Sequence, residues 1–271
     1  MRLVEIPDAV VRAAVFPFAD GPPLPPAHPD RLIEVSGATV FLGQGLPDGM
    51  VLPERVESAE LSMFVQEVRE RIRREERQRA VWFVPEAAHP ADLAARLLEL
   101  GFKPADQPPF EPRAAAMAIT RPPAEGPPNI ATHRVRTFEE LQAAWRVSAN
   151  AFAVDAQFAA AFEARAEALW PFEERSDDRA TFIATIDGEV VGAAGASFGK
   201  TAAYLGGSGT HQDHRGRGVY RSLVRARWDA ADAHGTPALT VSAGDMSRPV
   251  LERLGFTIVG WNDCLFDDLS A

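Results

Sequence analysis

An Asp-Gly dipeptide, Asp187–Gly188, is the feature that most restricts how this chain can fold. It joins two apolar runs, ATFIATI and EVVGAAGAS. Both positions of a two-residue hairpin turn need positive φ, which aspartate and glycine tolerate, so the pattern predicts two antiparallel strands. Around this hairpin, periodicity and capping residues predict helices at 137–152, 157–169, 219–234 and 247–254, and strands at 202–210, 238–242 and 256–266. This order predicts an α/β (α+β) fold with a mixed, mostly antiparallel central sheet flanked by helices.

Two proline clusters divide the chain. The first, at 16–29, predicts an exposed connection without regular structure, and the second lies at 121–129. We therefore expect an N-terminal domain at 1–120, a Pro-rich linker at 121–131 and a C-terminal domain at 132–271. In the N-terminal domain the same signals predict strands at 31–42, 80–85 and 113–119, and helices at 58–79 and 91–100.

Composition narrows the partners and the compartment. The 271 residues carry a net charge of −10, which repels phosphate polymers and anionic lipid, so we expect neither a nucleic-acid nor a membrane partner. The single cysteine, Cys264, excludes an internal disulfide and a multi-cysteine metal site, and we predict no metal cofactor. We see neither a signal peptide nor a membrane span, so we expect a cytoplasmic monomer or homodimer.

A basic, glycine-containing loop follows the strand predicted at 202–210. It reads GTHQDHRGRGVYRSLVRARW and leads directly into a predicted helix. The loop is open to three interpretations: solvated arginines around a tight turn, a dinucleotide fingerprint, or a pyrophosphate site at a helix N-terminus. The fingerprint fits poorly because Arg221 stands where its third glycine is needed. The pyrophosphate site is favoured physically, because Gly216 and Gly218 let backbone N–H groups converge on an anion at the positive end of a helix.

The segment HRGRGVYRSLVRAR resembles the acyl-CoA-binding signature, Arg/Gln-x-x-Gly-x-Gly/Ala, of the GNAT N-acetyltransferase superfamily. The order of elements around it matches that family, and SRPVLERLGF is similar to the family's second recurring segment. This resemblance covers about 132–271. In the N-terminal half, VWFVPEAAHPADLAARLLELGF followed by MAI resembles a degenerate GNAT-like copy that lacks a Gly-x-Gly loop. The resemblance therefore implies a two-lobed member with one acyl-CoA site.

The resemblance also implies which residues bind acetyl-CoA, the acyl donor. The backbone of Ser208, Gly209 and Thr210 would pair with the pantetheine amides, and Ser247 could touch the same arm. The pyrophosphate would be wrapped mostly by backbone N–H groups of six consecutive residues: Arg215, Gly216, Arg217, Gly218, Val219 and Tyr220. The implied reaction is direct transfer of the acetyl group to a primary amine on a small molecule, peptide or protein. No covalent enzyme intermediate is needed, so we expect a structural role for Cys264.

The sequence departs from the family pattern in the catalytic residues. Leu251 stands where many members have the tyrosine that protonates the leaving thiolate, and the first signature position is Asp213. We expect Asp245 and Ser247 to be the catalytic candidates, although Asp245 could equally cap the following helix. His211 could relay protons or could be a solvated loop residue. The absent tyrosine leaves an alternative function, a non-catalytic acyl-CoA-binding regulatory module.

Overall fold

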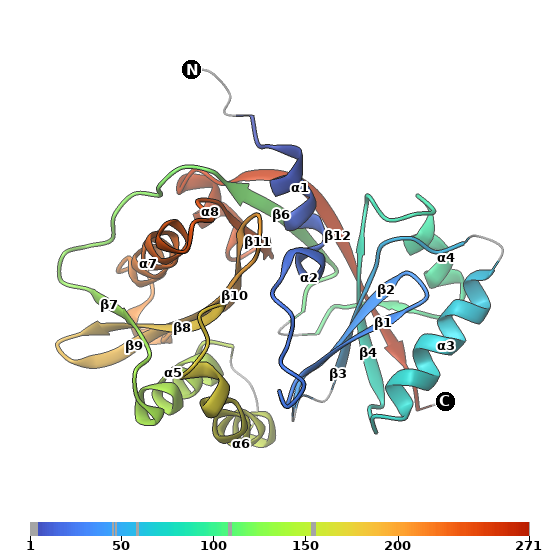
Figure 1. The fold of residues 1–271 in the computed structure, drawn as a ribbon, viewed down its shortest axis with the longest axis horizontal. Coiled ribbons are helices and arrows are strands. Elements are labelled where there is room, and N and C mark those ends of the chain that lie inside the picture. The colour runs from blue at the N-terminus through green and yellow to red at the C-terminus, as the bar shows by residue number, and fades with distance from the viewer. Residues whose placement is uncertain are drawn as a thin grey trace.

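A computed structural model describes residues 5–44, 46, 48–57, 60–107, 110–152 and 156–270 (Figure 1). Within these residues twelve strands form one sheet in the order β1-β2-β3-β4-β12-β6-β11-β10-β9-β8-β7, and β5 pairs with β12. Among the described strands only β3–β4 and β10–β11 pair in parallel, which confirms the predicted mixed and mostly antiparallel sheet. The strands are β1 Arg31–Val35, β2 Ala38–Leu42, β3 Asp48–Pro53, β4 Arg79–Pro85, β5 Lys103–Pro104, β6 Arg113–Ile119, β7 Ala131–Arg134, β8 Arg179–Ile186, β9 Glu189–Phe198, β10 Ala203–Thr210, β11 Leu239–Ala243 and β12 Thr257–Asp268. The helices are α1 Asp8–Val15, α2 Pro17–Asp20, α3 Leu61–Arg73, α4 Leu93–Glu99, α5 Phe138–Ala151, α6 Ala156–Glu173, α7 Val219–His234 and α8 Arg248–Arg253.

Residues with positive φ form the turns of two hairpins, β8–β9 and β1–β2. Asp187 and Gly188 adopt φ values of 51° and 84° between β8 and β9, as predicted. A second turn of this kind was not predicted: Ser36 and Gly37 have φ values of 42° and 96°. The single strand predicted at 31–42 is therefore wrong, and this segment forms the β1–β2 hairpin. A side chain at position 37 would bring Cβ within 1.9 Å of the Arg55 carbonyl oxygen, so this turn needs glycine.

Helix boundaries follow their capping residues. The Thr137 hydroxyl accepts a hydrogen bond from the Glu140 amide, which caps α5 as predicted. The first proline cluster, however, contains α2, so the prediction that it lacks regular structure is wrong. Pro17 stands at the first helical position, where a missing N–H group costs no hydrogen bond. The helix predicted at 58–79 is shorter: residues 58–59 lie outside the described part, α3 ends at Arg73, and β4 begins at Arg79.

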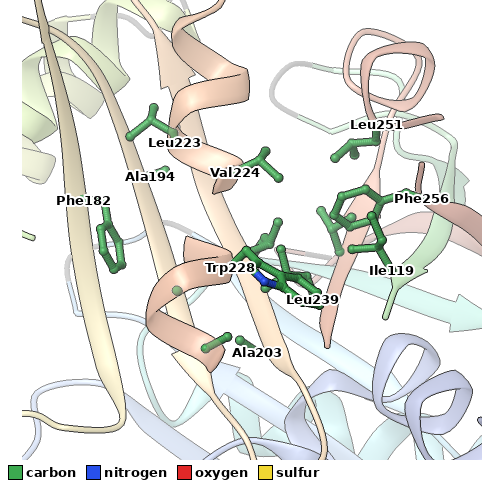
Figure 2. Close-up of a cluster of buried hydrophobic side chains, with 14 of the residues drawn as sticks. Ile119, Phe182, Ala194, Ala203, Leu223, Val224, Trp228, Leu239, Leu251 and Phe256 are labelled. Carbon is green, nitrogen blue, oxygen red and sulfur yellow. The ribbon is translucent and has the colours of Figure 1, made fainter. Parts of the chain in front are cut away.

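The C-terminal lobe is layered, with α7 on one face of β8, β9 and β10 and α5 on the other. Figure 2 shows the core beneath α7, where Trp228 lies beside Ala203 of β10 and Leu239 of β11, and Leu223 lies toward Ala194 of β9. Full burial of each such side chain contributes about 1.5–3 kcal/mol. On the opposite face α1 packs against β12, β6 and β11. The site described below therefore lies on a sheet supported from both sides.

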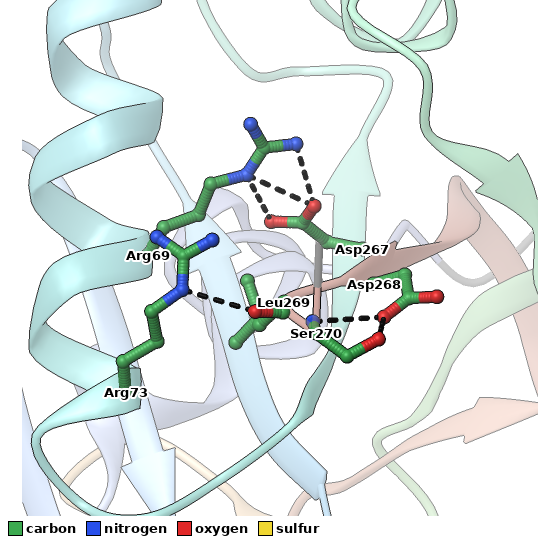
Figure 3. Close-up of polar contacts among 6 residues, drawn as sticks. All are labelled: Arg69, Arg73, Asp267, Asp268, Leu269 and Ser270. Atoms are coloured by element: carbon green, nitrogen blue, oxygen red, sulfur yellow. Dashed lines mark hydrogen bonds and ion pairs between the residues drawn. The ribbon is translucent and has the colours of Figure 1, made fainter.

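The two lobes share this sheet. Strand β6 from the N-terminal half lies between β11 and β12, and β12 continues into the N-terminal lobe to pair with β4. Figure 3 shows how α3 holds the far end of β12: the Arg69 guanidinium contacts the buried Asp267 carboxylate at 2.7 Å, and Arg73 Nε donates to the Leu269 carbonyl at 3.0 Å. A second link joins α6 to the segment before β1, where Arg165 donates to both Asp30 carboxylate oxygens at 2.6 and 2.7 Å.

Candidate functional site

The parallel strands β10 and β11 separate after a short stretch of pairing. Their register contains only Ala203 opposite Leu239 and Tyr204 opposite Thr240. Beyond this point β10 continues to Thr210 and β11 to Ala243, and none of the described strands lies between their facing edges. Ligands of α/β proteins bind at the carboxyl ends of strands, where neighbouring strands part. This opening is therefore the candidate site.

A β-bulge in β10 shapes one wall of the opening. Gly206 pairs with Gly195 of β9 and Gly209 pairs with Ala193, so Gly207 and Ser208 oppose a single residue. Gly207 has a φ of 39°, which glycine adopts without strain. A Cβ added at Gly206 or Gly207 would meet no atom within 4 Å, so the backbone here is open to a ligand. Gly209 differs, because its Cβ would lie 2.9 Å from the side chain of Ala151 in α5.

A fully buried arginine of α7 holds this bulge from behind. Arg227 Nη1 donates to the Ser208 hydroxyl at 2.8 Å and to the Gly195 carbonyl at 3.2 Å, and its Nε donates to the Leu223 carbonyl at 3.0 Å. Burial lowers the pKa of Arg227 to about 10, and the nearby Tyr220 hydroxyl partly offsets that shift. Arg227 therefore remains charged near neutral pH and places a cation directly behind the bulge.

Backbone N–H groups converge at the start of α7. The Arg215 amide donates to the Gln212 carbonyl at 3.3 Å, but within the described residues the amides of Gly216, Arg217 and Gly218 have no protein acceptor. Val219 and Tyr220 begin the helix, where N–H groups lack an intrahelical partner. The loop is exposed at 215–217, so neither lobe covers it. These amides and the helix dipole make a site for an anion such as a diphosphate.

The predicted linker passes beside this loop without filling it. Gly218 has a φ of 90°, and a Cβ there would lie 2.6 Å from Pro127 Cγ. Pro127 has no N–H group, and its carbonyl accepts a hydrogen bond from the Ile130 amide at 3.1 Å. The Arg215 side chain donates to the Ala151 carbonyl at the end of α5, at 2.8 Å. The linker and α5 therefore border the loop, and its amides stay free of both.

The predicted catalytic residues lie in the loop that follows β11. The Asp245 side chain is 85% exposed and accepts a hydrogen bond from Arg248 at 3.1 Å. Ser247 takes the N-cap position of α8 without a capping hydrogen bond, and its hydroxyl is 3.4 Å from the Gly244 carbonyl. The capping alternative for Asp245 is therefore wrong. Both residues are at the opening, on the β11 side.

Three other residues singled out in the sequence have defined surroundings. Leu251 is fully buried in the core beneath α7, where it can neither donate nor accept a proton. The His211 ring nitrogen accepts a long hydrogen bond, 3.4 Å, from the Asp213 amide. Cys264 is buried, and burial together with the nearby Asp263 and Glu111 carboxylates raises the pKa of its thiol to about 12. The thiol is therefore not a nucleophile at neutral pH.

Sequence reasoning missed three polar residues around the opening: Arg227 and Tyr204 lie beside it, and Glu111 lies past the end of β11 on the β6 side. Tyr204 lies on β10 with its hydroxyl beside the backbone of Ser242 in β11, and burial raises its pKa to about 12. Glu111 precedes β6, and its carboxylate accepts a hydrogen bond from the Asp245 amide at 2.6 Å. Arg227 could have been identified from the sequence, because it follows Leu223 by four residues and so lies on the apolar stripe of α7, where a charged residue is unusual. Nothing local in the sequence marked Tyr204 or Glu111.

The described residues were also compared with the requirements of a metal site and of a membrane span. No group of three or more His, Cys, Asp or Glu side chains in the described ranges could hold a metal ion. None of the described helices is both long enough and apolar enough to cross a membrane.

Comparison with known proteins identifies the family of the C-terminal lobe. Residues 137–256 match the model of the Acetyltransferase (GNAT) family. A GCN5-related N-acetyltransferase from Kribbella flavida has a similar structure, with a TM-score of 0.69, 19% identity and 95% of each chain covered. A tandem GNAT protein from the clavulanic acid biosynthesis pathway has a TM-score of 0.59 at 17% identity, covering 98% of this chain and 89% of that one. No curated protein matches the sequence. At these identities the structural likeness shows the fold, and that fold has two lobes.

Proposed function

Because residues 137–256 belong to the GNAT acetyltransferase family and the whole chain has the two-lobed GNAT fold, we propose that this protein is an N-acetyltransferase that uses acetyl-CoA. It transfers the acetyl group directly to a primary amine of a small molecule, peptide or protein. The observation that carries this proposal is the set of unpaired amides from Gly216 to Tyr220, next to the opening between β10 and β11. These two features fit the diphosphate and the acylated pantetheine arm of one acyl-CoA molecule.

In this proposal the loop binds the diphosphate and the open edge of β10 binds the pantetheine arm. The amides of Gly216, Arg217 and Gly218 donate to phosphate oxygens, and the flanking arginines add charge. The backbone of Ser208 and Thr210 pairs with the pantetheine amides as a neighbouring strand would. The thioester then lies at the bulge, where the positions above Gly206 and Gly207 are open.

The bulge also suits the chemistry of acyl transfer. The nitrogen of the free amine attacks the thioester carbon, the carbon–nitrogen bond forms, and the carbon–sulfur bond breaks. The nitrogen loses one proton, and the departing thiolate takes one up and leaves as CoA thiol. Negative charge builds up on the thioester oxygen in the transition state. Backbone donors at the bulge, with the Arg227 cation behind them, would stabilise that charge.

Ligand binding and turnover test the proposal separately. Acetyl-CoA at one hundred times its Kd should stabilise the protein by about 2.7 kcal/mol, measured as a shift in thermal unfolding. Arg217→Glu places a negative charge in the exposed loop and should weaken acetyl-CoA binding at least tenfold, about 1.4 kcal/mol. Arg175→Glu, at another exposed arginine, is the control and should leave binding unchanged. No stabilisation of the wild-type protein by acetyl-CoA would contradict the proposal.

One observation favours a second function, a non-catalytic acyl-CoA-binding module. Leu251 is packed in the core at the position where many family members carry a proton donor. Release of free CoA thiol, followed with a thiol reagent across a panel of primary amines, distinguishes the two functions. Turnover on any amine supports the enzyme, whereas tight acetyl-CoA binding without turnover supports the module.

A further inference from the structure

A carboxylate from the N-terminal lobe reaches the end of β11. Glu111 Oε2 accepts a hydrogen bond from the Asp245 amide at 2.6 Å, across 134 residues of sequence. The same carboxylate fills the space beside Gly244: a Cβ at position 244 would lie 2.5–2.6 Å from its carboxyl atoms. The glycine therefore leaves room for Glu111, and the half-buried carboxylate is held in one place.

This carboxylate lies on the sheet face opposite α7. On that face Ser242 of β11 pairs with Ala116, which packs beneath α1, whereas the neighbouring Ala243 belongs to the core beneath α7. Cys264, whose thiol pKa the Glu111 charge helps to raise, packs with Ala114 on the same side as Ala116. The site loop and α7 therefore bind the donor from one side, and Glu111 lies on the other.

Tyr204 lies on this same face, at the point where β10 and β11 separate. It is the last β10 residue paired with β11, and it alternates with Ala203 and Leu205, which pack beneath α7. Its side chain therefore points to the opposite face, toward the backbone of Ser242. Glu111 is held past the end of β11 on this same face, and we expect an amine that approaches the thioester from this face to pass Tyr204 and the end of β11.

The acceptor needs a base, because a lysine-like amine has a pKa of about 10.4 and arrives protonated at neutral pH. The two carboxylates at the end of β11 differ: Asp245 is exposed and paired with Arg248, whereas Glu111 is held by a backbone amide. We propose that Glu111 is the catalytic base and that the N-terminal lobe supplies it to the acetyl-CoA site of the C-terminal lobe. This inference rests on the acetyltransferase function proposed above.

The proton balance is simple. The bound ammonium gives one proton to the Glu111 carboxylate and becomes a free amine, which attacks the thioester carbon. A carbon–nitrogen bond forms and the carbon–sulfur bond breaks. The second nitrogen proton passes to the departing thiolate, which leaves as CoA thiol, and Glu111 returns its proton to solvent. The products are the acetylated amine, CoA thiol and one proton.

Glu111→Gln is the decisive variant, because its amide oxygen still accepts the Asp245 N–H bond but cannot take a proton. Rates are measured by CoA thiol release with butylamine, phenylethylamine, cadaverine and a lysine-containing tripeptide, and the amine that the wild type turns over best is used. We expect unchanged acetyl-CoA affinity within twofold and a kcat/KM lowered by about 10²–10³-fold at pH 7. Glu173→Gln, which also replaces a carboxylate that accepts a backbone N–H bond, should retain wild-type rates.

The pH dependence separates a base from a structural role. Without Glu111 the enzyme must use amine that is already deprotonated in solution, and that fraction rises tenfold per pH unit below about 10.4. The defect of Glu111→Gln should therefore shrink about 100-fold between pH 7 and pH 9, and added formate should partly restore the rate of Glu111→Ala. A pH-independent defect, a loss of acetyl-CoA binding, or wild-type rates in Glu111→Gln would overturn the inference alone. Failure of the wild type to use any amine would overturn the proposed function as well.

Discussion

Replacing Arg227 by methionine tests whether the β10 bulge depends on a buried cation. Methionine has a comparable length and keeps the apolar packing of α7, but it removes the hydrogen bonds that the guanidinium donates to Ser208, Gly195 and Leu223. Hydrogen bonds to charged groups contribute about 1.5–3 kcal/mol each, so about 5–9 kcal/mol is lost. The Ser208 hydroxyl belongs to the bulge, and the Gly195 carbonyl lies at its edge, opposite Gly206.

The opposing contribution is the cost of burying the charge. Burial lowers the pKa of Arg227 from 12.5 to about 10, a difference that corresponds to about 3 kcal/mol at neutral pH. Methionine removes this cost, so Arg227→Met should lower the free energy of unfolding by about 2–6 kcal/mol. The hydrogen bonds contribute more than the desolvation costs, because one guanidinium group donates to several acceptors at once. Arg227→Lys keeps the charge without the fork and should fall between the two.

Equilibrium urea unfolding measures this difference as a lower midpoint at an unchanged m value. Arg225→Met is the matched control, because Arg225 lies on the partly exposed face of the same helix and pairs with Asp229 four residues later. Its loss should cost no more than about 1 kcal/mol. If Arg227→Met were as stable as the wild type or more stable, the desolvation cost would outweigh the hydrogen bonds, as happens for some buried ion pairs, and the reasoning would be refuted.

Three further predictions follow from the same structure. Gly218→Ala should destabilise the protein more than Gly101→Ala and should also weaken acetyl-CoA binding in calorimetry, because both glycines have φ near 90° but only Gly218 contacts a neighbour, Pro127; equal effects would contradict this. Asp30→Asn should cost about 3–5 kcal/mol in urea unfolding, since it leaves a buried guanidinium without its counter-ion on the other lobe, and a cost below about 1 kcal/mol would show that the link is dispensable. Cys264 has a thiol pKa of about 12, so only about one thiol in 10⁴ is ionised at pH 8, and mass spectrometry should find iodoacetamide labelling only after unfolding; rapid labelling of the native protein would count against its burial.

Local signals in the sequence predicted the elements that local chemistry controls. The β8–β9 hairpin depends on two adjacent residues, and α7 begins after Gly218 and ends before Gly235, both with positive φ. The β1–β2 turn was missed because Ser-Gly is a weaker turn signal than Asp-Gly, although both residues adopt positive φ. The glycine-rich loop could likewise be located from the sequence, because glycines and a helix start within a few consecutive residues are enough to predict an anion site.

Contacts between distant segments could not be predicted in this way. The hydrogen bond from Asp245 to Glu111 joins segments that lie in different halves of the chain, and no periodicity or motif connects them. The position of β6 between β11 and β12 is a similar case, because strand order depends on the whole sheet and not on the strand's own residues. Arg227 is intermediate: its place on an apolar stripe is visible in the sequence, but one of its acceptors, Ser208, belongs to a bulge that only the structure reveals.

The absence of a Gly-x-Gly loop from the N-terminal half does not make that half a passive remnant. Its strand β6 is buried on both faces, with Met117 and Ile119 in the core beneath α7 and Ala116 and Ala118 beneath α1. Without β6, the hydrogen-bonding edge of β11 that faces away from the opening would have no partner, and the strand that lines the site would lose its support. The segment that brings β6 into the sheet also brings Glu111 to the end of β11. The insertion of β6 therefore has two consequences: it completes the sheet of the C-terminal lobe, and it brings the Glu111 carboxylate to the end of β11.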